Sequence, residues 1–319
     1  MTSRKAIIFI GYLVSISFLI GCQENTEQNS DTNKPKARGA IGEIIMVIDS
    51  AKYQGPVGDA LREVFAADIP GLIRSEQAFN LRIVDPRAMN RMLRAATNII
   101  FVTTFEDNRP GSRALNAQFS AASKEKATED STLYMLRAEN EFAIGQEVIY
   151  LFGTNEEELI KNLEINKQKL QNLFEVRERE RLARGILSRK NSAITVKAEQ
   201  KFGINFTVPA SYQFVQEDED FMWVRQPTAT DRRPDISLFL YRTDYLSEDQ
   251  LQPENIIKLR DEITRERIFG DPANRNSYVE IQERATPSFR NISVDGKYAI
   301  ELRTQWRTHN LSMGGSLLS

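Results

Sequence analysis

The chain has 319 residues, of which 41% are hydrophobic and 27% charged, enough apolar material for one large or two ordinary domains. Its 42 basic and 44 acidic side chains nearly balance, so it lacks the basic excess of a nucleic-acid-binding protein. One cysteine excludes a disulfide framework, and one histidine excludes any site that needs several imidazoles.

Residues 1–21 predict a secretory signal peptide. Arg4 and Lys5 form a short cationic start, and an uncharged, largely apolar run follows that is shorter than a membrane-spanning helix. The next residues, Leu19-Ile20-Gly21-Cys22, resemble the lipobox of bacterial lipoproteins. The resemblance implies that the signal is cleaved before Cys22 and that this cysteine carries a diacylglyceryl thioether and a further acyl chain such as palmitate. Cys22 is therefore the predicted lipid attachment site.

Residues 22–41 are predicted to be the lipidated cysteine and a flexible tether. Gln23 to Ala40 contains no large apolar side chain, so it cannot bury enough surface to offset its ordering entropy. Two or three acyl chains would hold the protein durably at a membrane of the bacterial cell envelope. Gln23 is not the aspartate that retains many lipoproteins at the inner membrane, which favours the outer membrane.

Residues 42–190 predict an N-terminal α/β module in which strands and helices alternate, so that most strands pair in parallel. A polar helix is expected near 116–126. A capping box at Thr154-Asn155-Glu156-Glu157 opens a long linking helix, Glu156–Arg189. The other predicted elements are strands at 43–49, 79–84, 98–103 and 147–152, and helices at 56–70 and 86–96.

Residues 191–319 predict a C-terminal α+β module, because the hydrophobic period falls to two. We expect one antiparallel sheet with one helix across it, from Pro253 to Gly270. The predicted strands are 202–208, 212–214, 221–224, 236–241, 278–282 and 297–306. The whole chain is thus a mixed α/β and α+β protein, and its second module more loosely resembles the Mog1- and PsbP-type fold.

Several stretches resemble a family of bacterial lipoproteins known as domain of unknown function 4837. They are Tyr53–Glu63, Asn98–Ile100, Phe142–Gln146, Glu178–Arg181, Phe202–Ile204, Val208–Tyr212, Phe221–Trp223 and Met313–Gly315. The resemblance implies lipid anchoring and the two-module organisation, and it brings no activity. Family members continue after Gly314-Gly315 with a further strand, so the C-terminal module is expected to be truncated, with Ser316–Ser319 as the first arm of an unfinished hairpin.

Candidate sites in the sequence are few, and no catalytic, cofactor or metal residue is predicted. The Gly55–Asp59 loop opens a helix but lacks a phosphate-binding glycine motif and a lysine. His309 is the one base available to a nucleophilic triad, and Glu217–Asp220 could offer oxygen ligands to calcium. The charged segment Arg177–Arg181 fits a solvated helix surface better than a docking face. The aromatic residues of the second module are expected to form the core face of its sheet.

The sequence therefore predicts a lipid-anchored cell-envelope protein that acts as a non-catalytic binding or structural module. Its partners would be the membrane, through Cys22, and another envelope protein or a glycan. The alternative is an envelope hydrolase that uses paired carboxylates on a glycan or peptide, because two acids can meet in a cleft without any sequence signal. A third possibility is a structural protein whose long helix docks a partner.

Overall fold

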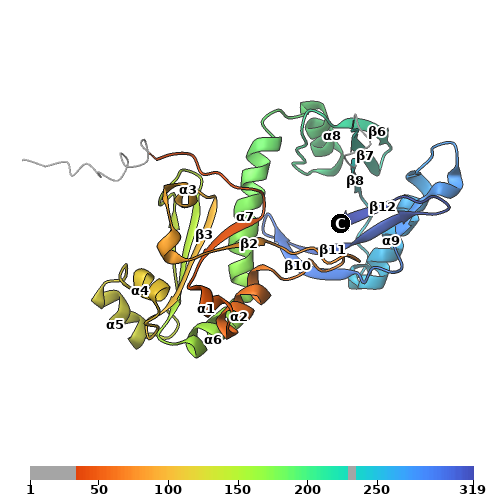
Figure 1. Ribbon diagram of the computed structural model, residues 1–319. Helices are drawn as coiled ribbons and strands as arrows, with labels where there is room; N and C mark the ends of the chain where they lie inside the picture. The colour runs from red at the N-terminus through yellow and green to blue at the C-terminus, as the bar shows by residue number, and fades with distance from the viewer. Residues whose placement is uncertain (1–33, 229–234) are drawn as a thin grey trace, which may run out of the picture.

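The computed structural model describes residues 34–228 and 235–319 (Figure 1). The N-terminal half forms a five-stranded sheet in the order β2-β1-β3-β5-β4, parallel except for β4, which confirms the predicted alternation of strands and helices. Its elements are β1 (Glu43–Val47), α1 (Ser50–Tyr53), α2 (Pro56–Phe65), β2 (Asn80–Val84), η3 (Pro86–Ala88), α3 (Arg91–Arg94), β3 (Asn98–Thr104), α4 (Pro110–Asn116), α5 (Ala121–Glu129), β4 (Met135–Glu139), β5 (Glu147–Gly153), α6 (Glu156–Ile165) and α7 (Lys167–Ile186).

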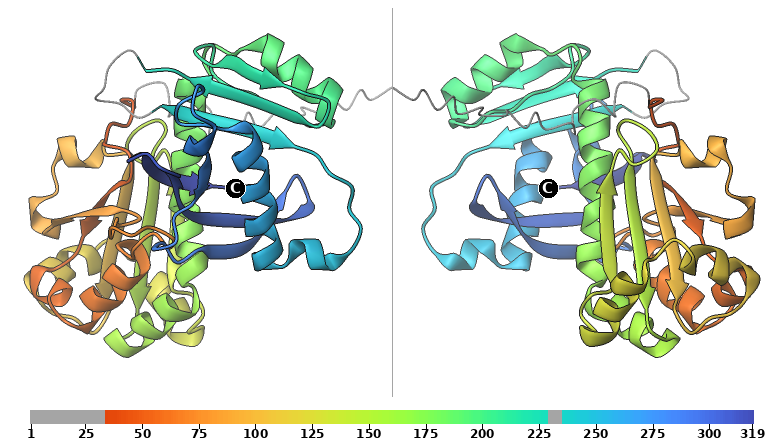
Figure 2. Two further views of the ribbon diagram at one scale, coloured as in Figure 1. Left: turned by 90° about the vertical axis from the view of Figure 1, so that its right-hand side faces the viewer. Right: turned by 90° about the vertical axis from the view of Figure 1, so that its left-hand side faces the viewer.

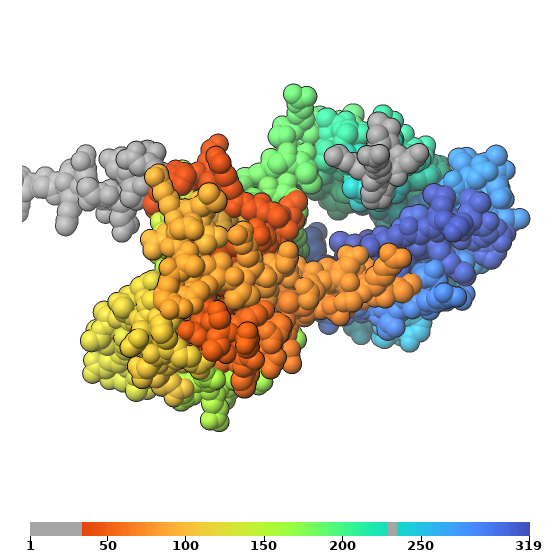
Figure 3. All heavy atoms as spheres, in the orientation of Figure 1, coloured from red at the N-terminus to blue at the C-terminus, as the bar shows by residue number. Residues whose placement is uncertain are grey.

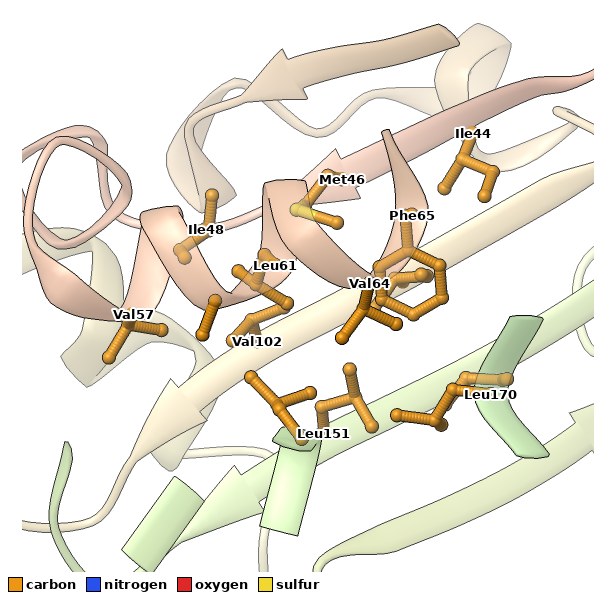
Figure 4. Packing of buried hydrophobic residues seen from close by; sticks show 14 of the residues in the cluster. Ile44, Met46, Ile48, Val57, Leu61, Val64, Phe65, Val102, Leu151 and Leu170 are labelled. Atoms are coloured by element: carbon orange, nitrogen blue, oxygen red, sulfur yellow. The ribbon is translucent and has the colours of Figure 1, made fainter. Parts of the chain in front are cut away.

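The central strands are continuous apolar runs because helices cover both faces of the sheet. On one face, side chains from α2, α6 and α7 pack against β1, β3 and β5; Figure 4 shows Phe65 of α2 and Leu170 of α7 in this core. On the other face, Leu93 of α3 and Leu115 of α4 pack against Phe101 and its neighbours. The sheet is therefore a buried central layer of the N-terminal half.

The predicted long helix is divided in two. Asn166 ends α6 and begins α7, with backbone angles outside the helical range (φ −103°, ψ 14°), and its side-chain amide donates to the carbonyl of Asn162 at 2.9 Å. Asparagine side chains often form such local hydrogen bonds to the backbone, which compete with the regular hydrogen bonds of a helix. The second piece, α7, runs along the sheet beside the yellow-green strands β4 and β5 (Figure 2).

The C-terminal half is antiparallel, as predicted, but its strands form two sheets. One has the order β6-β7-β8, and the other joins β10, β11 and β12, with β9 also paired to β11. The elements are α8 (Ser192–Phe202), β6 (Gln213–Glu217), β7 (Phe221–Gln226), β8 (Ile236–Tyr241), η4 (Glu248–Leu251), α9 (Pro253–Arg267), η5 (Arg275–Ser277), β9 (Val279–Ile281), β10 (Ser288–Val294), β11 (Lys297–Thr308) and β12 (Gly314–Leu318).

The predicted strand at 202–208 is wrong. Phe202 is the last residue of α8, a helix that the sequence analysis missed, and Gly203 ends this helix in the left-handed conformation (φ +68°). Phe202, Phe206 and Val208 still pack into the core between α8 and the β6-β7-β8 sheet. The alternation of apolar residues therefore arises from a helix end followed by a loop, whose side chains reach one core without forming a strand.

The aromatic side chains of this half mostly line its cores, as expected. Phe221 is fully buried between β7 and α9, and Tyr212 is 6% exposed beneath α8. Trp223 and Trp306 are partly buried against the same α9 core. Phe214 lies at the sheet surface under the ammonium group of Lys197, and Tyr245 and Tyr298 are also exposed.

The loop between α2 and β2 extends from the N-terminal half and packs against β11 of the C-terminal half. Gly71 of this loop lies so close to β11 that an added Cβ would be 2.3 Å from the carbonyl oxygen of Arg303, and its φ of +86° also favours glycine. Figure 3 shows this orange segment reaching across to the blue C-terminal part. β12 pairs antiparallel with β11, so Ser316–Leu318 belongs to the second arm of the β11–β12 hairpin.

Residues 34–40, within the predicted tether, contact the folded body. Ala37 N donates to the carbonyl of Ile144 at 2.9 Å, and Arg38 N donates to that of Ala95 at 2.8 Å. We call Lys34–Ala40 the N-terminal strap. The sequence predicted flexibility here because the segment has no large apolar side chain to bury, but backbone hydrogen bonds hold the strap on the body instead. Cys22 and residues 23–33 lie outside the described residues.

Candidate functional site

The carboxyl ends of β1 and β3 form the usual ligand crevice of a doubly wound sheet. The loop after β1 leads to the α2 face and the loop after β3 leads to the opposite face, so the two connections diverge here. In this protein the place is filled by a cluster of its own charged side chains, with Lys52 of α1 at the centre.

Lys52 is fully buried and has three partners. Its Nζ lies 2.7 Å from Glu156 Oε1, 3.1 Å from Asp107 Oδ2 and 2.9 Å from Thr104 Oγ1. Burial alone would raise the pKa of the Asp107 carboxyl, but hydrogen bonds from Arg109 N, Ser112 and Lys52 outweigh it and the net pKa is lowered. The cluster is thus an ionised network that joins the loops after β1, β3 and β5.

The N-terminal end of α4 closes the same crevice. Gly111 N donates to Asp49 Oδ2 at 3.2 Å, and an added Cβ on Gly111 would be 2.7 Å from that oxygen. The chain therefore occupies the crevice itself, which directs the search for a binding surface to other parts of the molecule.

A groove with a volume of about 700 Å³ lies between α7 and β4. We call it the α7–β4 groove. It is lined by charged side chains, two side-chain amides and an apolar surface to which Leu173 and Val176 contribute. Its lining residues are Arg137, Glu139, Gln168, Lys169, Asn172, Leu173, Val176, Arg177 and Glu180. Val176 is 44% exposed.

A network of ion pairs links the strand and helix residues that line the groove. Glu147, at the start of β5, is fully buried and binds Arg137 of β4 and Arg177 of α7. Arg177 also pairs with Glu139 and, at 3.2 Å, with Glu180. Burial lowers the pKa of the Arg177 guanidinium, but these carboxylates more than compensate and raise it above its ordinary value. The walls are therefore held by charge-assisted hydrogen bonds.

A second network fixes the C-terminal part of α7. Glu178 is 7% exposed and accepts hydrogen bonds from Asn98 Nδ2 and Arg181 Nη1, both at 2.7 Å, while Arg181 Nη2 donates to Asn98 Oδ1 at 3.0 Å. The interpretation of Arg177–Arg181 as a solvated helix surface is therefore wrong for three of its five residues, because only Arg179 and Glu180 are exposed. The other three side chains attach α7 to the amino ends of β3 and β5.

Strand β4 has a free edge on the groove side. Within the described residues it pairs with β5 alone, and the order of the sheet ends with it. A strand edge presents unpaired backbone N–H and C=O groups, which can accept a further strand. The groove thus combines an open strand edge with side-chain donors and acceptors from a helix.

The remaining candidates from the sequence lie apart from the groove. The His309 ring stacks on Tyr278 and has Nδ1 3.3 Å from Glu280 Oε1. Glu217 pairs with Lys197 and Lys201, and Asp218 and Asp220 pair with Arg267. Asp59 of the glycine loop pairs with Arg62 at 2.6 Å.

Across residues 34–228 and 235–319, no three acidic, histidine or cysteine side chains are grouped so that they could hold a metal ion. Over the same ranges, no helix combines the length and the apolar composition that a membrane span requires.

Comparison with protein families divides the chain between two models. Residues 190–319 match the family described as Domain of unknown function (DUF4837), which confirms the resemblance and shows that this range carries that domain. Residues 37–187 match a different family, Domain of unknown function (DUF8532). The stretches at Tyr53–Glu63, Asn98–Ile100, Phe142–Gln146 and Glu178–Arg181 fall within this second range. A search of the curated proteins and one of the solved structures found no match.

Proposed function

We propose that this protein is a non-catalytic, lipid-anchored component of the bacterial cell envelope. It holds an extended peptide segment of another envelope protein in the α7–β4 groove. The lipobox at Leu19–Cys22 supports the anchoring. The free edge of β4 beside a groove of about 700 Å³ is the observation that carries the binding function.

An added strand is the occupant that the groove suits best. Main-chain hydrogen bonds to β4 would supply affinity, and pockets for alternate side chains would supply specificity. Gln168 and Asn172 are side-chain amides with both donors and acceptors, which match the peptide groups of an extended segment. Leu173 and Val176 offer an apolar contact.

The charges of the groove favour a segment that is neutral overall. Three cationic side chains (Arg137, Lys169 and Arg177) meet three carboxylates (Glu139, Glu180 and the buried Glu147). Two of the cations are already paired within the network. A strongly acidic or basic peptide would therefore gain little here, and polar backbone contacts dominate.

The alternative hydrolase would need two carboxylates on either side of a scissile bond. Glu139 and Glu180 are the two acids that line the groove. The Arg177 guanidinium binds both of them, so it occupies the space between them where the bond would lie. This geometry favours binding over hydrolysis at this site.

Replacing Cys22 with serine tests the anchor. The hydroxyl group cannot form the thioether, so we expect the variant to carry no acyl chains. Mass spectrometry of the N-terminus of the variant and of the unmodified protein measures this. An unmodified protein whose mature N-terminus carries no acyl chain would contradict the anchoring.

Photo-crosslinking tests the groove. A photoreactive residue at Asn172 is expected to give one dominant adduct in cells, whose crosslinked fragment is a peptide, because an extended partner would pass beside it. Arg179 is the matched control, since it is exposed on the same helix and does not line the groove. Mass spectrometry of the adduct identifies the crosslinked segment.

A second test introduces a carboxylate into the α7–β4 groove at Val176. Val176→Glu should weaken the Asn172 adduct about tenfold, because a carboxylate would be desolvated against the bound segment. Val196→Glu on α8 is the control, since Val196 is 49% exposed against 44% for Val176. Equal adducts from Asn172 and Arg179, or no effect of Val176→Glu, would refute binding in the groove.

A further inference from the structure

Three connections meet at one edge of the N-terminal sheet. Strands β1, β3 and β5 are parallel, so their amino ends lie side by side, and the segments that precede them are residues 34–42, 90–97 and 140–146. The N-terminal strap, in the first segment, is hydrogen-bonded to the other two at Ala95 and Ile144. Figure 1 shows the red strap and α3 at the end of the N-terminal half opposite α6. We call the exposed surface of these three segments the strap face.

The strap face is positively charged. Its three segments carry five cationic side chains and one carboxylate, that of Glu141, which is half-buried. The cations are Lys34, Lys36, Arg38, Arg91 and Arg94. The last four are exposed, and none of these four pairs with a carboxylate within residues 34–228 and 235–319. The face is therefore locally cationic, although the whole chain has a formal net charge of −2.

Large apolar side chains are exposed among these cations. Ile41 is 71%, Met92 85% and Ile144 42% exposed, and Met92 is the most exposed large hydrophobic side chain in the described part of the chain. The cap of α3 fixes its direction. Asn90 Oδ1 accepts from Met92 N and Leu93 N, both at 3.0 Å, and Leu93 packs into the core, so the neighbouring Met92 points to solvent. A single exposed apolar residue is ordinary, but three on one cationic edge form an amphipathic surface.

The segment that leads to the predicted lipid attachment site joins the folded body at this face. Eleven residues, 23–33, separate Cys22 from Lys34. A chain spans no more than ~3.5 Å per residue, so Lys34 lies within about 40 Å of the acylated sulfur. Because the strap is hydrogen-bonded to the other two segments, an anchor at Cys22 would hold the body by its strap face.

We propose that the strap face docks on the surface of a bilayer that contains anionic phospholipids. The proposal rests on the lipid anchoring proposed above and adds an orientation to it. The four exposed cations would lie among the headgroup phosphates, and Ile41 and Met92 would enter the boundary between headgroups and acyl chains. Each basic side chain near an anionic surface strengthens binding about fivefold, so this charge complementarity favours a bilayer over a neutral partner.

Fluorescence quenching in vesicles tests the orientation. The acylated protein is reconstituted in phosphatidylcholine with about 30% phosphatidylglycerol, and mass spectrometry verifies its acyl chains. Cys22 is the one cysteine of the chain and its sulfur is blocked by acylation, so Ile41→Cys takes a single fluorescent label. Lipids with a nitroxide just below the headgroup should quench this label at least about threefold more than a label at Ile165→Cys. Ile165 is the matched control, since it ends α6 and is 70% exposed against 71% for Ile41.

Two further changes separate the charges from the apolar contact. Arg91→Gln combined with Arg94→Gln should lower the quenching of the Ile41 label to its level in phosphatidylcholine alone, because the attraction to the headgroups falls. Met92→Glu should lower it at least about twofold, because a carboxylate would be desolvated in the boundary. Arg82→Gln combined with Arg113→Gln is the control, since both arginines are exposed and lie outside the strap face, and it should leave the quenching unchanged.

The outcomes distinguish docking from anchoring. Equal quenching of the Ile41 and Ile165 labels in the acylated protein, or equal quenching with and without phosphatidylglycerol, would overturn the docking and leave the anchoring intact. An Ile41 label that is shielded from aqueous iodide but not quenched by the lipid nitroxide would identify a second copy of this chain as the occupant, and would also overturn the docking. A protein that carries no acyl chain would overturn both. Circular dichroism confirms that each variant is folded.

Discussion

Replacing Lys52 with methionine is expected to lower the free energy of unfolding by about 3 kcal/mol, because the change removes the buried cation of Asp107 and leaves this carboxylate only the partly exposed Arg109 as a charged partner. Lys52 is fully buried, and Asp107, one of its partners, has a side chain only 4% exposed. Methionine has a similar length and volume, so the loss would reflect uncompensated charge and not a cavity. Chemical denaturation followed by circular dichroism measures the change.

The pH dependence of this loss identifies its cause. The pKa of Asp107 is lowered in the folded protein, so its contribution to stability is present above its ordinary pKa of 3.8 and is lost as the pH falls below that value. The difference between Lys52→Met and the unmodified protein should therefore shrink toward pH 3. Lys126→Met on the exposed side of α5 should change stability by less than about 0.5 kcal/mol. A Lys52→Met protein as stable as this control would refute the ionised network.

Replacing Gly58 with alanine is expected to destabilise the N-terminal half by about 3 kcal/mol or more, because the first turn of α2 packs directly on the end of α1. A Cβ at this position would lie 1.6 Å from the carbonyl oxygen of Tyr53 and 2.4 Å from its carbonyl carbon. Both are backbone atoms, and the same oxygen accepts from Arg62 Nη1 at 3.3 Å, so the clash cannot be relieved by a rotamer change.

Gly55→Ala is the matched control three residues earlier. Its Cβ would have no neighbour nearer than 3.6 Å, and its φ of −101° is accessible to alanine. The loss of the glycine N-cap should cost no more than about 1 kcal/mol. The thermal unfolding of both variants gives the comparison, and equal effects would contradict the close packing of α1 on α2.

The sequence predicted the buried sheet well because a strand that is buried on both faces appears in the sequence as a continuous apolar run. The run Ile44–Ile48 is apolar at every position, since α2 covers one face and Leu93 and Leu115 cover the other. The parallel order then follows from the alternation with helices. Residues 190–319 match DUF4837, and four of the stretches that resemble this family in the sequence lie within that range.

The sites could not be predicted in the same way, because their charges come from distant parts of the chain. Lys52 meets Asp107 and Glu156, which are 55 and 104 residues further along, and nothing in its local sequence marks it as buried. Glu147 did leave a signal, since an acid begins the apolar strand EVIYLF. Such an acid at a strand buried on both faces predicts a cationic partner, although it does not identify Arg137 or Arg177.

Hydrophobic alternation also misled where the chain changes direction. Phe202, Phe206 and Val208 share one core although a helix end and a loop carry them, because Gly203 reverses the chain between them. The periodicity of apolar residues indicates which side chains are buried together, but it does not determine the backbone conformation that places them there.

The N-terminal strap would carry mechanical load in a protein tethered through Cys22. Any force that draws the body away from the lipid surface would pass along Lys34–Ala40 before it reaches the sheet. The strap attaches to the body through backbone hydrogen bonds at Ile144 and Ala95, so these bonds would bear the force first. Tension would thus act first on the segments that carry Ala95 and Ile144.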